Sequence, residues 1–172
     1  GRHDFNEVLF EDALIPEDHQ LGEVDSAWKQ ATSELAYERS GSERFLETIH
    51  VLIELVRALG PQPHPRDAME LGKLIAELHT LRRMSISVAG MLASGKEPVV
   101  ESSIVKDLGT NWEQALPERA RNLAALVESV AGNRAGFDAE LAFATIIAPK
   151  LTIQGGTREI LRGIIARGLG LR

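Results

Sequence analysis

The sequence contains no cysteine, which excludes disulfides, thiolate metal sites and cysteine nucleophiles and is compatible with a reducing cytoplasm. Aromatic residues make up only 5% of the chain, and 25 acidic residues outnumber 19 basic ones. No block of Lys and Arg with interleaved aromatics occurs, so a nucleic-acid surface is not expected. No apolar run approaches the roughly 18 residues that a membrane span needs, and no signal-peptide leader is recognisable. We therefore expect a soluble, cytoplasmic protein.

Motifs for self-contained chemistry are also scarce. The five histidines form no H-x-x-x-H pair, and no cysteine is present to join them, so no metal site is predicted. The sequence has no G-x-S-x-G elbow, no Walker loop and no G-x-G-x-x-G after a strand. Paired carboxylates fall at ordinary helix-surface spacings. Composition and motif search alone therefore assign no chemistry.

The N-terminal stretch differs from the rest of the chain. Residues 5–23, FNEVLFEDALIPEDHQLGE, combine a short apolar alternation with a proline, acidic turn residues and a glycine. This pattern predicts one strand followed by an extended loop. Because a lone strand cannot bury itself, we expect residues 1–25 to be the end of a neighbouring β domain and a linker. Residues 26–172 are expected to form a separate helical domain.

From residue 26 onward the apolar period is helical. A single long helix is predicted over residues 26–59, a second up to the SGKEP break, a third from about residue 104, a less regular fourth from about residue 137, and a last one from Thr157. The long helices are joined by short connections, which favours an up-and-down arrangement. The predicted fold is all-α, an up-and-down four-helix bundle with an extra C-terminal helix, preceded by a short strand and loop. The stripes expected to face the core include Phe45, Leu52, Val56, Leu74, Leu81, Val88, Leu108, Trp112, Leu116, Ile160 and Leu161.

A glycine pair and a threonine precede the last helix, in TIQGGTREILRGIIARGLGLR. Glycine lets a backbone approach a ligand closely, and the start of a helix points free N–H groups at an anion. On the pattern alone the simpler interpretation, a loop with an N-cap threonine, is favoured, because Gly and Thr are ordinary loop and cap residues. Both interpretations stay open.

The order of features resembles the C-terminal half of an acyl-CoA dehydrogenase. In that family a strand ends in a segment similar to FNEVLFEDALIPEDHQLGE, a long helix carries a Glu-Arg pair as in LAYERSGSER, and a helical bundle leads to a motif similar to GGTREILRGIIARGLG. The resemblance covers the whole chain. The terminal motif is specific, with matching positions at Gly156, Thr157, Glu159, Ile160, Arg162, Ile164, Ile165, Ala166, Leu169 and Gly170.

The resemblance implies a flavin-dependent oxidoreductase of lipid metabolism. Such an enzyme binds FAD and an acyl-CoA substrate and forms the 2-enoyl thioester, as in fatty acid β-oxidation. Thr157 and Glu159 occupy positions similar to those that bind FAD, and Gly132 falls in another cofactor-binding turn.

The resemblance also implies where the base comes from. Many members carry the catalytic glutamate directly before Gly-Thr, where this chain has Gly155. A minority, similar to the long-chain and isovaleryl enzymes, supply the base from the first long helix. The matching candidate is Glu38, with Arg39 beside it as a substrate-binding candidate. Without the resemblance, Glu38 and Arg39 would be a solvated pair on a helix surface.

Two departures from the family pattern leave a second function open. The stretch ELVRALGPQPHPRD, residues 54–67, is shorter than in the family and lacks the Arg-x-x-Phe-Gly segment that reaches the FAD of a neighbouring subunit, and Glu128 stands where the family tends to place a glutamine. Such losses are expected in a non-catalytic, dehydrogenase-like scaffold subunit of a heteromeric complex. In either case the resemblance implies assembly, as a homo-oligomer (dimer or tetramer) or with a related subunit.

Overall fold

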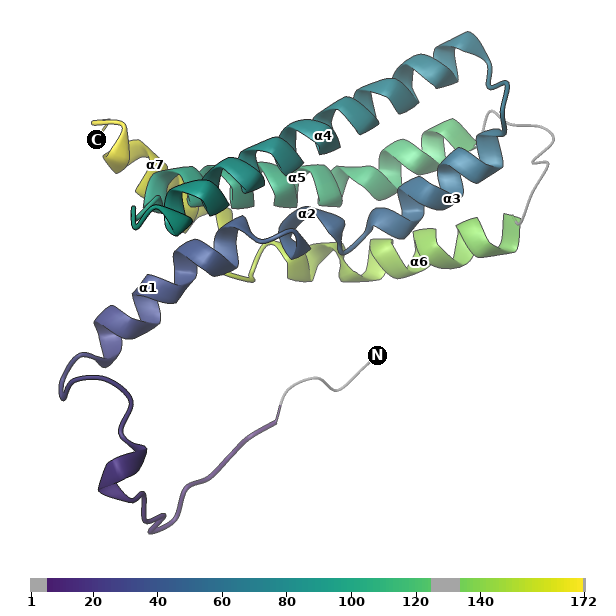
Figure 1. Cartoon of the computed structure of the whole chain (residues 1–172). Coiled ribbons are helices and arrows are strands. Elements are labelled where there is room, and N and C mark those ends of the chain that lie inside the picture. Colours follow the sequence, from purple (N-terminus) through teal and green to yellow (C-terminus); the bar gives the residue numbers. More distant parts are fainter. Residues whose placement is uncertain (1–5, 125–133, 172) are drawn as a thin grey trace.

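The computed structural model describes residues 6–124 and 134–171, and every regular element in these ranges is helical, with no strand. The all-α prediction is therefore confirmed. Helices α1 (Ala27–Ser40), α2 (Glu43–Leu46) and α3 (Ile49–Leu59) follow one another along the chain (Figure 1). The single helix predicted over residues 26–59 is thus wrong, because two breaks divide it.

Tertiary hydrogen bonds replace helical ones at both breaks. Gly41 is extended, with ψ of 154°, and the carbonyl oxygen of Glu38 accepts instead from Arg44 Nε at 2.8 Å. Further on, the N–H of Thr48 donates to Glu113 Oε1 of another helix at 3.1 Å. One freed backbone group at each break therefore has a side-chain partner.

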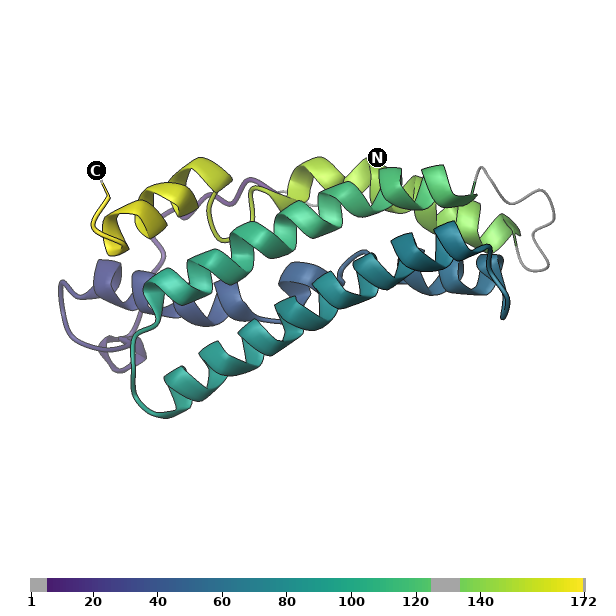
Figure 2. The ribbon, with the colours of Figure 1, turned by 90° about the horizontal axis from the view of Figure 1, so that it is seen from above.

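Helices α4 (Pro65–Ala93) and α5 (Val99–Ala124) form the long antiparallel pair of the bundle (Figures 1 and 2). Helix α4 begins with a proline in its first turn, where no N–H is needed, and the His64 side chain accepts from the N–H of Arg66. It ends just before Gly95, whose φ of 75° suits glycine. The second predicted helix is therefore confirmed.

Helices α6 (Arg134–Leu151) and α7 (Arg158–Gly168) complete the fold. Helix α6 packs against α3 and α5, and α7 packs against α5 at the end of the bundle where α1 also contacts α5. Helices α3 to α6 thus form the four-helix bundle, and α7 is the extra C-terminal helix, with Thr157, where its start was predicted, as its N-cap residue.

Residues of α2, α3, α4, α5 and α6 together form one apolar core. Its most deeply buried members include Phe45, Leu55, Leu74, Leu81, Val88, Val105, Trp112, Leu116, Phe137 and Ala144. Most of the predicted stripe residues lie in or against this core, but Val56, Leu108 and Ile160 are 43%, 44% and 56% exposed. Leu55, next to Val56, and Leu161, next to Ile160, are fully buried. A helix repeats every 3.6 residues, so a fixed spacing of three or four residues does not follow its buried face over several turns.

Residues 6–25 are all exposed, and their only regular element is the short 3-10 helix η1 (Glu17–His19). The strand predicted here is not formed within the described residues, because a strand needs a partner to complete its ladder. The domain boundary at residue 25 stays a prediction. Among the described helices, none combines the length and the apolar character required to cross a bilayer.

Candidate functional site

The candidate base Glu38 lies against the glycine pair that precedes α7. A Cβ atom on Gly155 would lie 3.4 Å from Glu38 Oε1 and 3.5 Å from its carboxyl carbon. Gly155 has φ of 69° and Gly156 has φ of 110°, conformations that side chains other than glycine rarely adopt. The fold therefore brings the first helix and the turn before the last helix to one place, 117 positions apart in the chain.

Arg39 fastens α1 to this turn. Its side chain is buried, and Nε donates to the carbonyl oxygen of Gly155 at 2.8 Å. Burial lowers the pKa of the Arg39 guanidinium, and the adjacent charge of Glu38 opposes that shift. Arg39 thus holds the turn in this structure, and its assignment to substrate binding stays a prediction.

Arg44 of α2 makes a second link between the same two segments. Its Nη2 lies 3.2 Å from Glu38 Oε1, and its Nη1 donates to Gln154 Oε1 at 2.9 Å. Sequence reasoning missed Arg44 and Gln154. The available signal was Gly41, a helix breaker inside ERSGSER, residues 38–44. The break at Gly41 lets the second Glu-Arg pair, Glu43 and Arg44, turn back toward Glu38 and Arg39.

Two buried charges of α5 hold the ends of the neighbouring helices. Lys106 Nζ donates to the carbonyl oxygen of Leu151, the last residue of α6, at 2.6 Å. Glu113 accepts from Thr48 at the start of α3. Burial lowers the pKa of Lys106 to about 8, with a further lowering by the Arg44 cation. Burial also raises the pKa of Glu113 to about 7, although hydrogen bonds from backbone N–H groups favour its charged form.

The start of α7 carries the two described cofactor candidates. Thr157 is the extended N-cap residue, and Glu159 lies exposed in the first turn. The pKa of Glu159 is lowered, first by a hydrogen bond from its own backbone N–H and then by one from the Thr157 hydroxyl. The turn itself is held to α5, because Arg158 Nε donates to Asp107 Oδ1 at 2.9 Å. The third candidate, Gly132, lies outside the described residues, as does Glu128.

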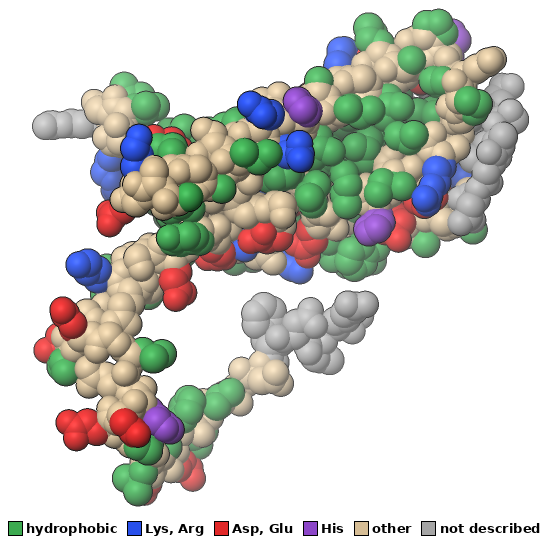
Figure 3. Space-filling view, in the orientation of Figure 1, with side chains coloured by type: hydrophobic (Ala, Val, Ile, Leu, Met, Phe, Trp, Pro, Cys, Tyr) green, Lys and Arg blue, Asp and Glu red, His purple; other side chains and the backbone are tan. Residues whose placement is uncertain are grey.

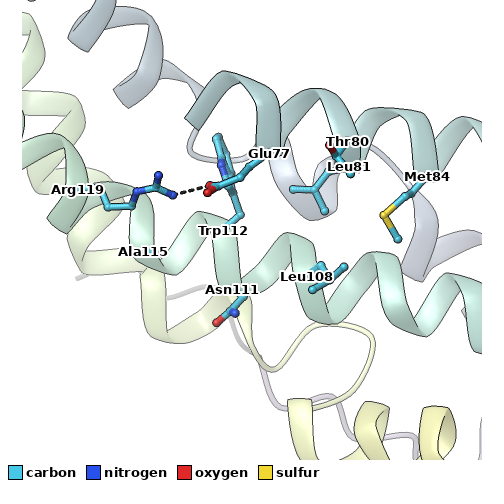
Figure 4. Close-up of a pocket in the computed structure, with 9 residues that line it drawn as sticks. All are labelled: Glu77, Thr80, Leu81, Met84, Leu108, Asn111, Trp112, Ala115 and Arg119. Atoms are coloured by element: carbon cyan, nitrogen blue, oxygen red, sulfur yellow. Dashed lines mark hydrogen bonds and ion pairs between the residues drawn. The ribbon is translucent and has the colours of Figure 1, made fainter. Parts of the chain in front are cut away.

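A separate groove lies between α4 and α5 (Figure 4). It has a volume of about 360 Å³, and its rim carries the ion pair of Glu77 with Arg119. Hydrophobic side chains gather on this side of the bundle below α4 (Figure 3). None of the residues that line the groove is a predicted site residue. Within the described part of the chain, no three His, Asp or Glu side chains gather as a metal site.

Comparison with known proteins identifies the family. The family model described as "Acyl-CoA dehydrogenase, C-terminal domain" matches residues 26–170. This chain belongs to the acyl-CoA dehydrogenase family. The match covers the bundle, the Glu38 helix and the Gly155–Gly156 turn, so the predicted family is confirmed.

The acyl-CoA dehydrogenase domain also has individual relatives. It is 30% identical over 172 residues to acyl-CoA dehydrogenase FadE34 of Mycobacterium tuberculosis, with 97% of this chain and 23% of FadE34 covered. It is 29% identical over 180 residues to acyl-CoA dehydrogenase IpdE1 of Mycolicibacterium smegmatis, with 99% and 43% covered. The chain thus spans less than half the length of these relatives.

A solved structure shares the fold of this acyl-CoA dehydrogenase domain. It is a variant of the Tcur3481–Tcur3483 steroid ACAD, similar with a TM-score of 0.69 and 21% identity. The likeness covers 88% of this chain and 42% of that chain. At this identity it supports the all-helical architecture and no more.

Proposed function

We propose that this chain is the C-terminal helical part of a flavin-dependent acyl-CoA dehydrogenase, with Glu38 as the catalytic base. The observation that carries the proposal is the contact between Glu38 and Gly155. The resemblance gives the family two chain positions for its base, and in this fold the carboxylate from one of them lies 3.4 Å from where a Cβ at the other would be. In this proposal the base comes from residue 38 and not from residue 155, and its carboxylate still lies beside the turn before α7.

The reaction forms a 2-enoyl thioester from an acyl-CoA. When bound, FAD supplies the acceptor for the hydride that leaves the β carbon. Glu38 takes the proton as the α C–H bond breaks, and the electron pair of that bond becomes part of the new carbon–carbon double bond. The product is a protonated Glu38 and an enoyl thioester. Arg39 contributes by fixing the turn that faces Glu38, since it donates to the Gly155 carbonyl oxygen.

The start of α7 fits a cofactor with several hydrogen-bonding groups. Gly156, with φ of 110°, allows close approach of the backbone, and the Thr157 hydroxyl lies at the helix start. Glu159 already accepts from the local N–H group, so its exposed carboxylate is suited to hydroxyl or N–H donors of the cofactor, whereas phosphates would be repelled. We assign Thr157 and Glu159 to FAD on these grounds.

The test is Glu38→Gln in the full-length protein, because glutamine keeps the shape of the side chain but cannot take the proton. The rate of flavin reduction by a cognate acyl-CoA is measured as the loss of visible absorbance. It is expected to fall about 100-fold to 10,000-fold, as for a lost general base. Straight-chain, branched and steroid acyl-CoAs are all tested as substrates. Glu34→Gln is the matched control, since Glu34 lies exposed one turn earlier on α1.

The alternative is a non-catalytic scaffold subunit in a heteromeric complex. The observation that favours it is the short α3–α4 connection, residues 60–64, since the stretch around it lacks the Arg-x-x-Phe-Gly segment. A full-length protein that is purified without flavin, or a Glu38→Gln enzyme that keeps full activity, would support this alternative.

Under either function we propose that the chain assembles, with itself or with a related subunit, through apolar side chains left exposed on α4 such as Met69, Ile75 and Ile86.

A further inference from the structure

Arg44 donates hydrogen bonds to three oxygen atoms at the candidate site, and its Nη2 also lies 3.8 Å from Glu43 Oε1. Nε donates to the Glu38 carbonyl oxygen at 2.8 Å, Nη2 lies 3.2 Å from Glu38 Oε1, and Nη1 donates to Gln154 Oε1 at 2.9 Å. One planar guanidinium therefore joins the backbone of the base, the side chain of the base and the residue directly before Gly155. A lysine has a single nitrogen and cannot reproduce this fork.

We propose that Arg44 is a positioning residue, which orients the Glu38 carboxylate toward the Gly155–Gly156 turn. The proposal rests on the proposed function, in which Glu38 is the base. In this scheme Arg44 contacts the base and does not touch the substrate. It acts on the reaction by restricting where the carboxylate oxygens lie.

The surroundings of Arg44 keep the guanidinium in place. Its side chain is only 9% exposed, and the next residue, Phe45, is buried in the core. The backbone carbonyl oxygen of Arg44 lies so close to α5 that a Cβ atom on Gly109 would be 2.5 Å from it. The Arg44 charge lowers the pKa of Lys106 on α5. Arg44 is therefore fixed through its backbone as well as its side chain.

Oε1 of the Glu38 carboxylate is engaged by Arg44. Oε1 is also the oxygen that would lie 3.4 Å from a Cβ atom on Gly155. Arg44 therefore holds the carboxylate oxygen that faces the glycine turn, and the position of that oxygen depends on the guanidinium.

The test compares Arg44→Met and Arg44→Lys in the full-length protein, with Arg57→Met as the matched control. Arg57 forms an exposed ion pair with Glu54 on α3, so its removal also breaks an Arg–Glu pair but leaves the site alone. Flavin reduction at saturating acyl-CoA should fall about 10-fold to 100-fold in Arg44→Met, the range expected when a catalytic group is misplaced by about 1 Å. Arg44→Lys should recover part of that loss. Acyl-CoA binding should change less than about 3-fold, because the contact is not made to the substrate.

Two further readouts separate positioning from general loss of structure. Substrate deuterated at the α carbon should show a larger isotope effect on flavin reduction in Arg44→Met than in the wild type, because proton transfer becomes slower relative to other steps. Amide hydrogen exchange across residues 152–157 should become faster in Arg44→Met and stay unchanged in Arg57→Met, a result that does not depend on flavin.

The outcomes distinguish this proposal from the proposed function. If Glu38→Gln abolishes flavin reduction while Arg44→Met keeps the wild-type rate and isotope effect, the positioning role is overturned and the base assignment stands. If Glu38→Gln keeps full activity, the base assignment itself fails. If Arg44→Met does not fold, a wild-type rate and isotope effect in Arg44→Lys would overturn the positioning role, because lysine keeps the charge but loses the fork.

Discussion

Glu38 occupies the space next to Gly155 that a side chain at residue 155 would need. A carboxylate on either residue would therefore face the same place in the site. The φ of 69° at residue 155 favours glycine there. This relationship gives the first prediction.

Gly155→Glu combined with Glu38→Gln should return part of the flavin reduction that Glu38→Gln alone removes. The new carboxylate would reach the site from the turn, where many family members carry their base. The matched control is Gly155→Gln combined with Glu38→Gln, which has the same size and no proton acceptor. Stopped-flow flavin reduction in the full-length protein measures the difference, and equal rates in the two double variants would contradict the prediction.

The single variant Gly155→Glu should be destabilised. A non-glycine residue with positive φ costs about 1 to 2 kcal/mol, and two carboxylates in one place add repulsion. Urea unfolding of the chain provides the measurement.

Gly109→Ala should destabilise the fold by about 1 to 3 kcal/mol, the usual cost of overpacking. The added methyl would lie 2.5 Å from the Arg44 carbonyl oxygen, which is backbone and cannot rotate away. Gly72→Ala is the matched control, because it also lies inside a long helix but a Cβ there meets no atom within 4 Å. That variant should stabilise the fold by about 0.5 to 1 kcal/mol. Urea unfolding should thus give free-energy changes of opposite sign for two identical substitutions.

Glu113→Gln should remove a pH-dependent part of the stability. The pKa of Glu113 is about 7 in the fold and is ordinarily 4.5, so the folded state holds the proton more tightly. This contribution is complete below pH 4.5 and is lost as the pH rises through about 7. Between those limits the wild type should lose roughly 2 to 3 kcal/mol of unfolding free energy relative to Glu113→Gln.

Glu118→Gln supplies the control for that measurement, since Glu118 lies exposed on the same helix. Urea unfolding at a series of pH values should give parallel curves for the wild type and Glu118→Gln, and a flatter curve for Glu113→Gln. Parallel curves for all three proteins would show that Glu113 is already ionised in the fold at low pH.

The helices whose ends are marked by local sequence signals were predictable from the sequence. Helix α4 has a proline in its first turn and a left-handed glycine after its end, and α7 has an N-cap threonine. Each signal acts through atoms within a few residues, so the sequence pattern contains it. The Glu38 position was available only through the family resemblance, since its surroundings in the chain look like a solvated helix.

The division of residues 26–59 into three helices was predictable only at the first break, where Gly41 is a local signal. It depends on Arg44 reaching back to Glu38 and on Glu113 of α5 accepting from Thr48. These contacts exist only after the helices pack, and the apolar spacing continues across both breaks. The exposed position of Leu108 beside the α4–α5 groove has the same origin, because helix packing decides which residues of a stripe are covered.

Helix α5 lies beneath both halves of the candidate site: Gly109 is packed under the backbone of Arg44, and Lys106 holds the last carbonyl of α6 just before the glycine turn. The base and the turn are therefore aligned to one common reference, less than one helical turn of α5 in length. A shift of α5 would carry both of them along together. Their mutual spacing thus depends on one short stretch of α5, and substitutions in the outer helices can change the surface of the domain while Glu38 stays beside the Gly155–Gly156 turn.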